Sequence, residues 1–238
     1  MSSPARRAAP ADARATPGAP TAGAKLGARC GLPARSTPAL AMTSHTPLDP
    51  ALVVRAYREG VFPMALERGE IGWFSPDPRG ILPLDAVHVP ARLGRVVRSG
   101  RFEVSTDRDF EGVMRACAER PGEGTWISED ILQCYTALHR LGLAHSIEVW
   151  HEGRMVGGLY GVHLGGAFFG ESMFHRVTDA SKVALVSLVD RLQRRGFELL
   201  DIQWVTPHLE QFGAVSIPRR EYLARLRRAL AKSCRFDA

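Results

Sequence analysis

The sequence predicts an α/β (α+β) fold in which helices flank a mixed, largely antiparallel sheet. The first observation is a run of three apolar segments, 145–150, 155–163 and 167–173, separated only by short glycine-containing turns. Such turns join consecutive hairpins, so these strands are expected to pair antiparallel. The second observation is a helical pattern over 180–195 that leads into a further apolar strand at 199–204. A helix between strands predicts a crossover connection within the same sheet.

The predicted fold begins with a helix over 50–59. Asp49 is suited to its N-cap, Pro50 to its first position and Gly60 to its end. The chain then becomes irregular and aromatic. The prolines of Gly72–Arg79 exclude a helix there and disfavour a central strand.

Helical and strand patterns alternate through the rest of the chain. Caps and terminators mark most of the boundaries. The further predicted elements are a helix over 90–101, a strand over 102–105, a helix over 109–119 capped by Asp107, a helix over 129–141 between Ser128 and Gly142, and a final helix over 218–231.

Composition divides the chain into three parts. Residues 1–44 are rich in Ala, Pro, Gly, Ser and Thr, so we expect them to be disordered or to precede the true start, for which Met42 is a candidate. They hold six basic residues against one acidic residue, a net +5, which leaves about +1 of the whole-chain +6 for the remainder. We expect a small N-terminal subdomain over 45–100, with the aromatic segment and a basic helix, and a catalytic domain over 101–238.

Composition also excludes several classes of protein. No apolar run approaches the roughly 20 residues needed to cross a bilayer, and no apolar core follows the basic residues of the tail as in a secretory signal. The four cysteines are widely spaced and the eight histidines form no ligand cluster. We therefore expect a cytoplasmic protein with no metal and no membrane partner. We also expect a monomer without a cofactor.

Three polar residues stand out inside apolar strands. Glu171 lies in the apolar run from Gly165 to Phe174, where a carboxylate needs a hydrogen-bond network or a ligand. Asp201 and Gln203 are two apart in the next strand, which places both side chains on one face. Together they predict the polar floor of a pocket.

A basic stripe is predicted on the helix over 90–101. Its arginines recur every third residue, at Arg92, Arg95, Arg98 and Arg101, and no acid interleaves with them. This pattern fits either a solvated helix face or a surface that contacts phosphates.

Nine motifs in order, over about Asp49–Leu230, resemble those of the bacterial leucyl/phenylalanyl-tRNA–protein transferases. They are YREGVFPMA from Tyr57, GWFSPDPR from Gly72, TWI from Thr125, HSIEVW from His145, VGGLYG from Val156, GESMF from Gly170, DASK from Asp179, DIQ from Asp201 and HLEQFGA from His208. Three places depart from the usual pattern: Gly72-Trp73-Phe74 for the aromatic motif, His175 for Ser, and Ile202 for Cys. The order of strands and crossover helix is likewise reminiscent of GNAT-type N-acyltransferases.

The resemblance implies transfer of leucine or phenylalanine, with methionine a further donor residue, from aminoacyl-tRNA to proteins that begin with Arg or Lys. The product would then be marked for degradation by the N-end rule. We expect Asp201 to accept hydrogen bonds from the incoming amine and from Gln203, whose amide oxygen orients the amine or receives its proton. The alternative is a satisfied buried polar pair that links two strands.

The resemblance also implies a substrate pocket and a tRNA surface. Glu171 resembles the family's pocket glutamate and either holds the donor's amino group or orients Ser172. The other expected pocket residues are Leu159 and Leu188 as apolar walls, or as ordinary core, and Trp73 and Trp126 as stacking surfaces for the terminal adenosine. The arginine stripe is expected to contact tRNA.

Two rival functions remain open from the sequence. An acyl-CoA-dependent N-acyltransferase would suit the order of elements, but its pyrophosphate loop is usually glycine-rich and the loop from Phe174 to Lys182 has no glycine. A non-catalytic tRNA-binding module would suit the arginine stripe and would leave the three buried polar residues unexplained.

Overall fold

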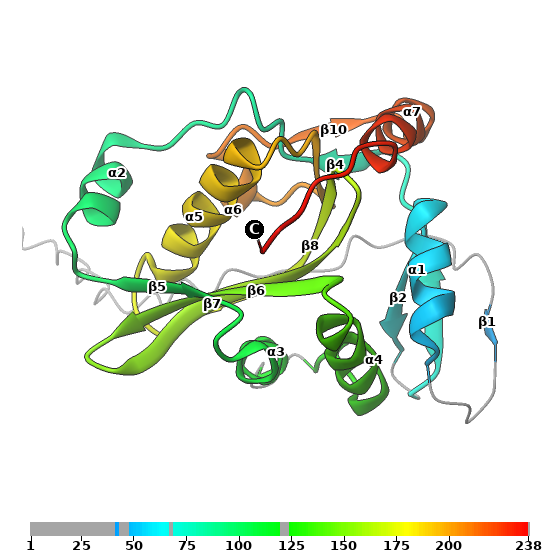
Figure 1. Ribbon diagram of the computed structural model, residues 1–238, viewed down its shortest axis with the longest axis horizontal. Helices are drawn as coiled ribbons and strands as arrows, with labels where there is room; N and C mark the ends of the chain where they lie inside the picture. Colours follow the sequence, from blue (N-terminus) through cyan, green and yellow to red (C-terminus); the bar gives the residue numbers. More distant parts are fainter. Residues whose placement is uncertain (1–40, 43–47, 67–68, 120–123, 238) are drawn as a thin grey trace, which may run out of the picture. The chain divides into compact units, whose positions relative to one another are not determined.

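The structure, a computed structural model, describes residues 41–42, 48–66, 69–119 and 124–237 (Figure 1). These residues all belong to one unit of the chain, Leu32–Ala238. Apart from 41–42, the predicted N-terminal extension over 1–44 lies outside the described residues.

Helices and strands alternate along the described chain. The helices are α1 Pro50–Arg58, α2 Ala91–Arg98, α3 Phe110–Ala118, α4 Glu129–Arg140, α5 Ala180–Arg194, α6 Pro207–Glu210 and α7 Arg219–Leu230. The strands are β1 Ala41–Met42, β2 Phe62–Ala65, β3 Ile71–Phe74, β4 Arg79–Ile81, β5 Glu103–Thr106, β6 Ala144–His151, β7 Arg154–Leu164, β8 Ala167–His175, β9 Leu199–Gln203 and β10 Val215–Ile217.

The strands form a small sheet and a large sheet. The small sheet has the order β1-β3-β2, and the large one has the order β10-β4-β9-β8-β7-β6-β5. Neighbours in the large sheet are antiparallel except β8 and β9, which are parallel and joined through the crossover helix α5. The prediction of a mixed, largely antiparallel sheet with the N-acyltransferase order of elements is confirmed.

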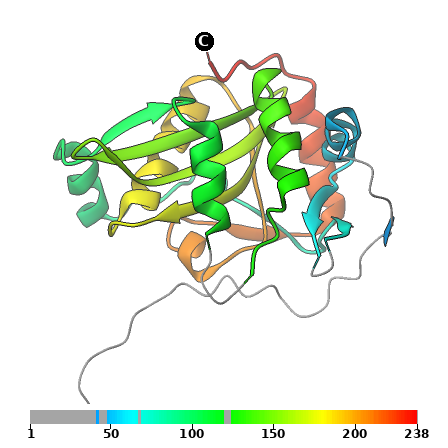
Figure 2. The same cartoon turned by 90° about the horizontal axis from the view of Figure 1, so that it is seen from below.

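Helices cover both faces of the large sheet (Figure 1, Figure 2). Helices α3 and α4 pack on one face, and α5 packs on the other with α2 against it. Each face has its own buried cluster of apolar side chains. Helices α1 and α7 lie side by side, and their buried tyrosines, Tyr57 and Tyr222, belong to the cluster on the α3 and α4 face.

The caps that the sequence predicts are correct at two helices and wrong at one. Asp49 and Ser128 cap α1 and α4 with their side chains. Helix α3 is instead capped by Asp109, whose Oδ1 accepts from the Gly112 N–H at 3.0 Å. Asp107 has φ +58° and its carboxylate accepts from His145 and the Ser146 N–H, so it ties β5 to β6 rather than starting a helix.

Five short strands, β1, β2, β3, β4 and β10, and the short helix α6 are not among the predicted elements. The expectation that Gly72–Arg79 disfavours a central strand fails at both ends of the segment. Residues 72–74 belong to β3, the middle strand of the small sheet, and β4 begins at Arg79 and pairs with both β10 and β9. The prolines lie between these two strands, so they remove no hydrogen bond from either ladder. The predicted domain boundary near residue 100 stays a prediction, although β4, from the predicted N-terminal part, belongs to the large sheet.

None of the helices among the described residues is long and apolar enough to span a membrane.

Candidate active site

The parallel strands β8 and β9 part in the middle of the large sheet. Their last paired residues are Phe169 and Asp201, after which β8 runs on to His175 and β9 to Gln203 without pairing to each other. Glu171 and Gln203 each lie two residues beyond this last pair. The three polar residues that the sequence singles out therefore lie at, or just beyond, the point where the two strands separate.

Glu171 is the extra residue of a β-bulge. Between β7 and β8, Tyr160 pairs with Ser172 and Gly161 pairs with Gly170, so no residue of β7 faces Glu171. A bulge re-aims the side chain that it carries, and bulges are common beside active sites. A Cβ on Gly161 would lie 2.2 Å from the Phe169 carbonyl oxygen, so the bulge requires glycine there.

Glu171 sits beside two buried tyrosines. The hydroxyls of Tyr57 on α1 and Tyr135 on α4 are hydrogen-bonded to each other at 2.5 Å. As hydrogen-bond donors, the two tyrosine hydroxyls lower the pKa of Glu171. Neither hydroxyl reaches the buried Oε1 of Glu171, which has no partner among the described residues. Burial outweighs the tyrosines and, with repulsion from Asp201, raises the pKa of Glu171 from its ordinary 4.5 to about 8.

Substituting Glu171 with Gln is expected to remove part of the pH dependence of stability. The pKa of Glu171 is higher in the folded chain than in the unfolded chain, so the wild type loses stability as pH rises from about 4.5 to about 8. Because Gln cannot ionise, the free energy of unfolding of the variant should rise relative to that of the wild type over that pH range, by roughly 1.4 kcal/mol per unit of pKa shift. Urea unfolding at several pH values measures the difference, and a pH-independent difference would contradict the prediction.

Asp201 is fully buried and receives four hydrogen bonds. Arg79 donates from Nε to Oδ1 at 2.9 Å and from Nη2 to Oδ2 at 2.6 Å. The Tyr222 hydroxyl donates to Oδ2 at 2.7 Å, and the Gln203 backbone N–H donates to Oδ1 at 2.9 Å. A carboxylate has about four acceptor positions, so Asp201 has none left for an incoming amine. The expected bond from the Gln203 side chain is replaced by one from its backbone.

Arg79 is a residue of the candidate site that the sequence analysis does not identify. Its guanidinium is fully buried between the rings of Phe62 and Tyr222, 4.8 and 4.5 Å from their centroids, and also donates to the Gly60 carbonyl at 3.1 Å. Burial lowers its pKa, but the Asp201 carboxylate outweighs burial and raises the pKa above its ordinary value. A buried carboxylate at Asp201 is itself the signal that a buried cation must exist somewhere in the chain.

Gln203 is held in an uncommon backbone conformation. Its φ is +56°, and the Trp204 N–H donates to the Ile202 carbonyl at 2.6 Å across it, which closes a strained three-residue γ-turn. Opposite the turn, a Cβ on Gly80 would lie 2.7 Å from the Trp204 carbonyl carbon. The buried Nε2 of Gln203 has no partner among the described residues. The turn therefore presents an unused amide donor where β8 and β9 part.

The other expected pocket residues are placed differently. Leu159 and Leu188 are buried in the cluster on the α5 face, whereas the tyrosines beside Glu171 belong to the opposite cluster. Trp73 and Trp126 are partly buried on either side of β2: Trp73 pairs with Pro63, and the Trp126 carbonyl accepts from the Ala65 N–H at 3.1 Å. Ser172 pairs with Tyr160 on the far side of the bulge.

The arginine stripe is partly neutralised. Arg92 forms two hydrogen bonds to Asp179, the N-cap of α5, at 2.8 and 2.6 Å. Arg101 lies beyond α2 with its guanidinium 4.9 Å from the Phe102 ring centroid. Arg95 and Arg98 are exposed and have no acidic partner among the described residues. Asp179, from a distant part of the sequence, thus neutralises one arginine of the stripe, and the expected contact of the stripe with tRNA stays a prediction.

A metal site is not found among the residues that the structure describes. No group of three His, Cys, Asp or Glu side chains is arranged there to hold an ion. Buried side-chain atoms without a hydrogen-bond partner among the same residues include the acceptor Oε1 of Glu171 and the donor Nε2 of Gln203, together with Thr136 Oγ1 and His208 Nε2.

Parallel strands joined by a crossover helix within a largely antiparallel sheet define the class of protein, an α/β domain with an N-acyltransferase-like fold. The family model described as leucyl/phenylalanyl-tRNA protein transferase matches residues 81–227, and the model of that family's N-terminal domain matches residues 46–77. The chain belongs to this family.

Similar curated proteins carry the same description. The chain is 58% identical over 184 residues to the leucyl/phenylalanyl-tRNA–protein transferase of Rubrobacter xylanophilus, covering 77% of this chain and 95% of that protein. It is 56% identical over 190 residues to that of Gloeobacter violaceus, covering 79% and 97%. Among solved structures, L-PGS from Bacillus licheniformis is a distant match with a TM-score of 0.41 and 11% identity, covering 66% of this chain and 65% of that one.

Proposed function

We propose that this chain is an aminoacyltransferase that moves leucine or phenylalanine from aminoacyl-tRNA to the amino terminus of proteins beginning with Arg or Lys. The product enters degradation by the N-end rule. The relatives' shared activity supports the reaction. The observation that carries the site is the pair of unpartnered buried atoms, Glu171 Oε1 and Gln203 Nε2, where β8 and β9 part. An acceptor and a donor suit the amino group and the carbonyl oxygen of an aminoacyl ester.

Gln203 acts on the ester carbonyl. Its Nε2 donates a hydrogen bond to the carbonyl oxygen, where negative charge develops as the acceptor's amine attacks the carbonyl carbon. A C–N bond forms, the bond to the ribose oxygen breaks, and the proton lost by the amine passes through water to that oxygen. Because the ester is already activated, holding the reactants in place supplies most of the catalysis and lowers the activation free energy by on the order of 7 to 11 kcal/mol.

Asp201 acts through Gln203 rather than on the amine. Its four acceptor positions are filled, and one of them binds the Gln203 backbone N–H beside the strained turn. We therefore assign Asp201 a positioning role, supported by Arg79 and Tyr222. Glu171 binds the donor's amino group through Oε1.

The remaining expected contacts stay proposals. Leu159 and Leu188 are buried on the face of the sheet opposite the tyrosines beside Glu171, which favours the alternative that they are ordinary core. Trp73 and Trp126 stack on the terminal adenosine, and Ser172 supports Glu171. In the α2 stripe, Arg95 and Arg98 make the expected contacts with tRNA. A monomeric state, a cytoplasmic location and the absence of a cofactor also remain predictions.

The N-terminus of α5 is poorly suited to bind CoA, which argues against the alternative of an acyl-CoA-dependent N-acyltransferase. A CoA pyrophosphate would bind the free N–H groups at the start of such a helix. Here Ala180 and Ser181 are buried, and a Cβ on Gly157 would lie 2.5 Å from the Ala180 Cβ. The Asp179 carboxylate at the N-cap adds negative charge where a pyrophosphate would sit.

Transfer of labelled leucine from charged tRNA tests the proposal. The acceptors are two peptides that differ only in beginning with Arg or with Ala, and the mixture contains neither ATP nor metal. Transfer to the Arg peptide alone is the expected result. No transfer from tRNA, together with acetyl transfer from acetyl-CoA, would establish the rival. Binding of tRNA without transfer from either donor would favour a non-catalytic module.

A further inference from the structure

We infer that the outward faces of α1 and α7 form a second phosphate-binding surface for the tRNA donor, an inference that rests on the proposed function. The surface consists of four exposed arginines, named here the α1/α7 arginine face: Arg55, Arg58, Arg220 and Arg227. Like the predicted stripe on α2, it would bind phosphates, but it lies on the helices that hold the candidate site.

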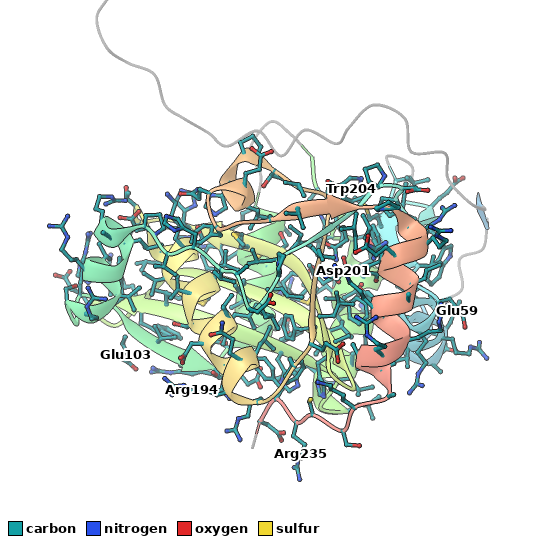
Figure 3. The ribbon with its side chains drawn as sticks, turned by 90° about the horizontal axis from the view of Figure 1, so that it is seen from above. Glu59, Glu103, Arg194, Asp201, Trp204 and Arg235 are labelled. Carbon is teal, nitrogen blue, oxygen red and sulfur yellow. The ribbon has the colours of Figure 1, made fainter. Side chains whose placement is uncertain are left out.

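Helix α7 connects this surface to the site. Its inward face carries Tyr222, whose hydroxyl donates to Asp201 at 2.7 Å. Figure 3 shows Asp201 beside this helix. Arg220 and Arg227 are seven residues apart, about two turns, so they share one face of the helix. Because that face is exposed while Tyr222 and Leu226 are buried, the two guanidinium groups lie about one helix diameter, roughly 10–12 Å, from the site.

Helix α1 extends the surface. Its inward face carries Tyr57, which is hydrogen-bonded to Tyr135 beside Glu171, and Arg55 and Arg58 are exposed. A Cβ on Gly60 would lie 2.8 Å from Leu223 Cδ2, so the end of α1 touches the middle of α7. Each helix thus presents a site tyrosine inward and arginines outward.

The charge of this surface is not compensated within the described chain. Other arginines of α7 have acidic partners: Arg225 pairs with Glu221 at 2.7 Å and Arg228 with Glu198 at 3.2 Å. The side chains of the four arginines of the α1/α7 arginine face have no hydrogen bond or ion pair with any described residue. The neighbouring exposed acids are Glu59 and Glu221, and Glu221 is paired with Arg225.

The positive charge of the α1/α7 arginine face determines which of the two substrates can bind to it. An acceptor that begins with Arg or Lys would be repelled by this surface, whereas a tRNA whose 3′ end enters the site presents phosphates to it. Unpaired arginines next to a nucleic-acid substrate are typical phosphate contacts, which position the substrate without reading its sequence. The partner is therefore the acceptor arm of the tRNA.

The test compares two double variants of equal charge. Arg220→Gln/Arg227→Gln removes two arginines of the surface, and Arg140→Gln/Arg154→Gln removes two exposed, unpaired arginines of α4 and β7. Exposed substitutions of this kind change stability little. Binding of charged tRNA is measured at several salt concentrations. Leucine transfer to the Arg peptide is measured from charged tRNA and from 3′-leucyl-adenosine, which has no phosphate.

The surface variant should bind tRNA about tenfold or more weakly at low salt, with a salt slope smaller by about two. Its transfer from 3′-leucyl-adenosine should equal that of the wild type, and the control should behave as the wild type in every measurement. Unchanged tRNA binding by the surface variant, or an equal loss of tRNA binding in both variants, would overturn the inference. The proposed function would still stand in that case, provided that the wild type transfers leucine. Absence of transfer by the wild type would instead overturn the proposed function.

Discussion

Replacing Arg79 with Met is expected to destabilise the fold by about 3–5 kcal/mol, because the substitution leaves the buried Asp201 carboxylate without its cation. Met keeps much of the side-chain volume, so the loss reports the charge and its hydrogen bonds more than a cavity. Urea unfolding followed by circular dichroism measures the change. Transfer activity should also fall, since Asp201 no longer holds the Gln203 turn in place.

Two further variants interpret this result. Adding Asp201→Asn to Arg79→Met removes the unpaired charge and should restore part of the stability, but not the activity. Arg225→Met removes an arginine that pairs with Glu221, four residues earlier on the same helix, and should cost at most about 0.5 kcal/mol. A loss below about 1 kcal/mol for Arg79→Met would show that the Arg79–Asp201 pair does not hold the fold together.

Replacing Gln203 with Ala is expected to lower kcat by about 10²–10³, because it removes the amide that stabilises the developing oxyanion. The affinity for charged tRNA should not change, since Gln203 acts on the reacting carbonyl and not on the tRNA phosphates. Single-turnover transfer together with tRNA binding separates the two quantities. Gln133→Ala, at an exposed amide of α4, is the matched control.

The variant Gln203→Gly distinguishes the effect of losing the side-chain amide from the effect of straining the backbone turn. Gly adopts positive φ without strain, so this variant should be more stable than Gln203→Ala by about 1 kcal/mol while it is equally slow in transfer. If either variant transferred leucine at the wild-type rate, the oxyanion role of Gln203 would be wrong. A loss of activity that followed a loss of folded protein would favour a purely structural polar pair.

The sequence predicts the polar residues of the site but not how they are paired. Glu171, Asp201 and Gln203 are conspicuous because a polar side chain in an apolar strand is costly. Arg79 is not conspicuous, because it follows two prolines and its partner is 122 positions away. The same limit applies to Arg92 and Asp179, which are 87 positions apart.

The long helices and hairpins are predictable for a physical reason. Caps and glycine turns act over a few residues, so α1, α4 and the β6 to β8 hairpins are visible locally. Strands β4 and β10 are three residues long and exist through pairing with distant strands, which no local pattern reports. The bulge at Glu171 is also invisible in the sequence, because it depends on the register between β7 and β8.

A crystal structure with a non-hydrolysable, amide-linked analogue of 3′-leucyl-adenosine tests the central claim most directly. The account predicts the analogue where β8 and β9 part, with its amino group on Glu171 Oε1 and its carbonyl oxygen about 2.7–3.1 Å from Gln203 Nε2. The structure also has a cavity of about 320 Å³ lined by residues such as Leu84, Phe197 and Arg225. Binding in that cavity, with Glu171 and Gln203 left without a ligand, would contradict the account.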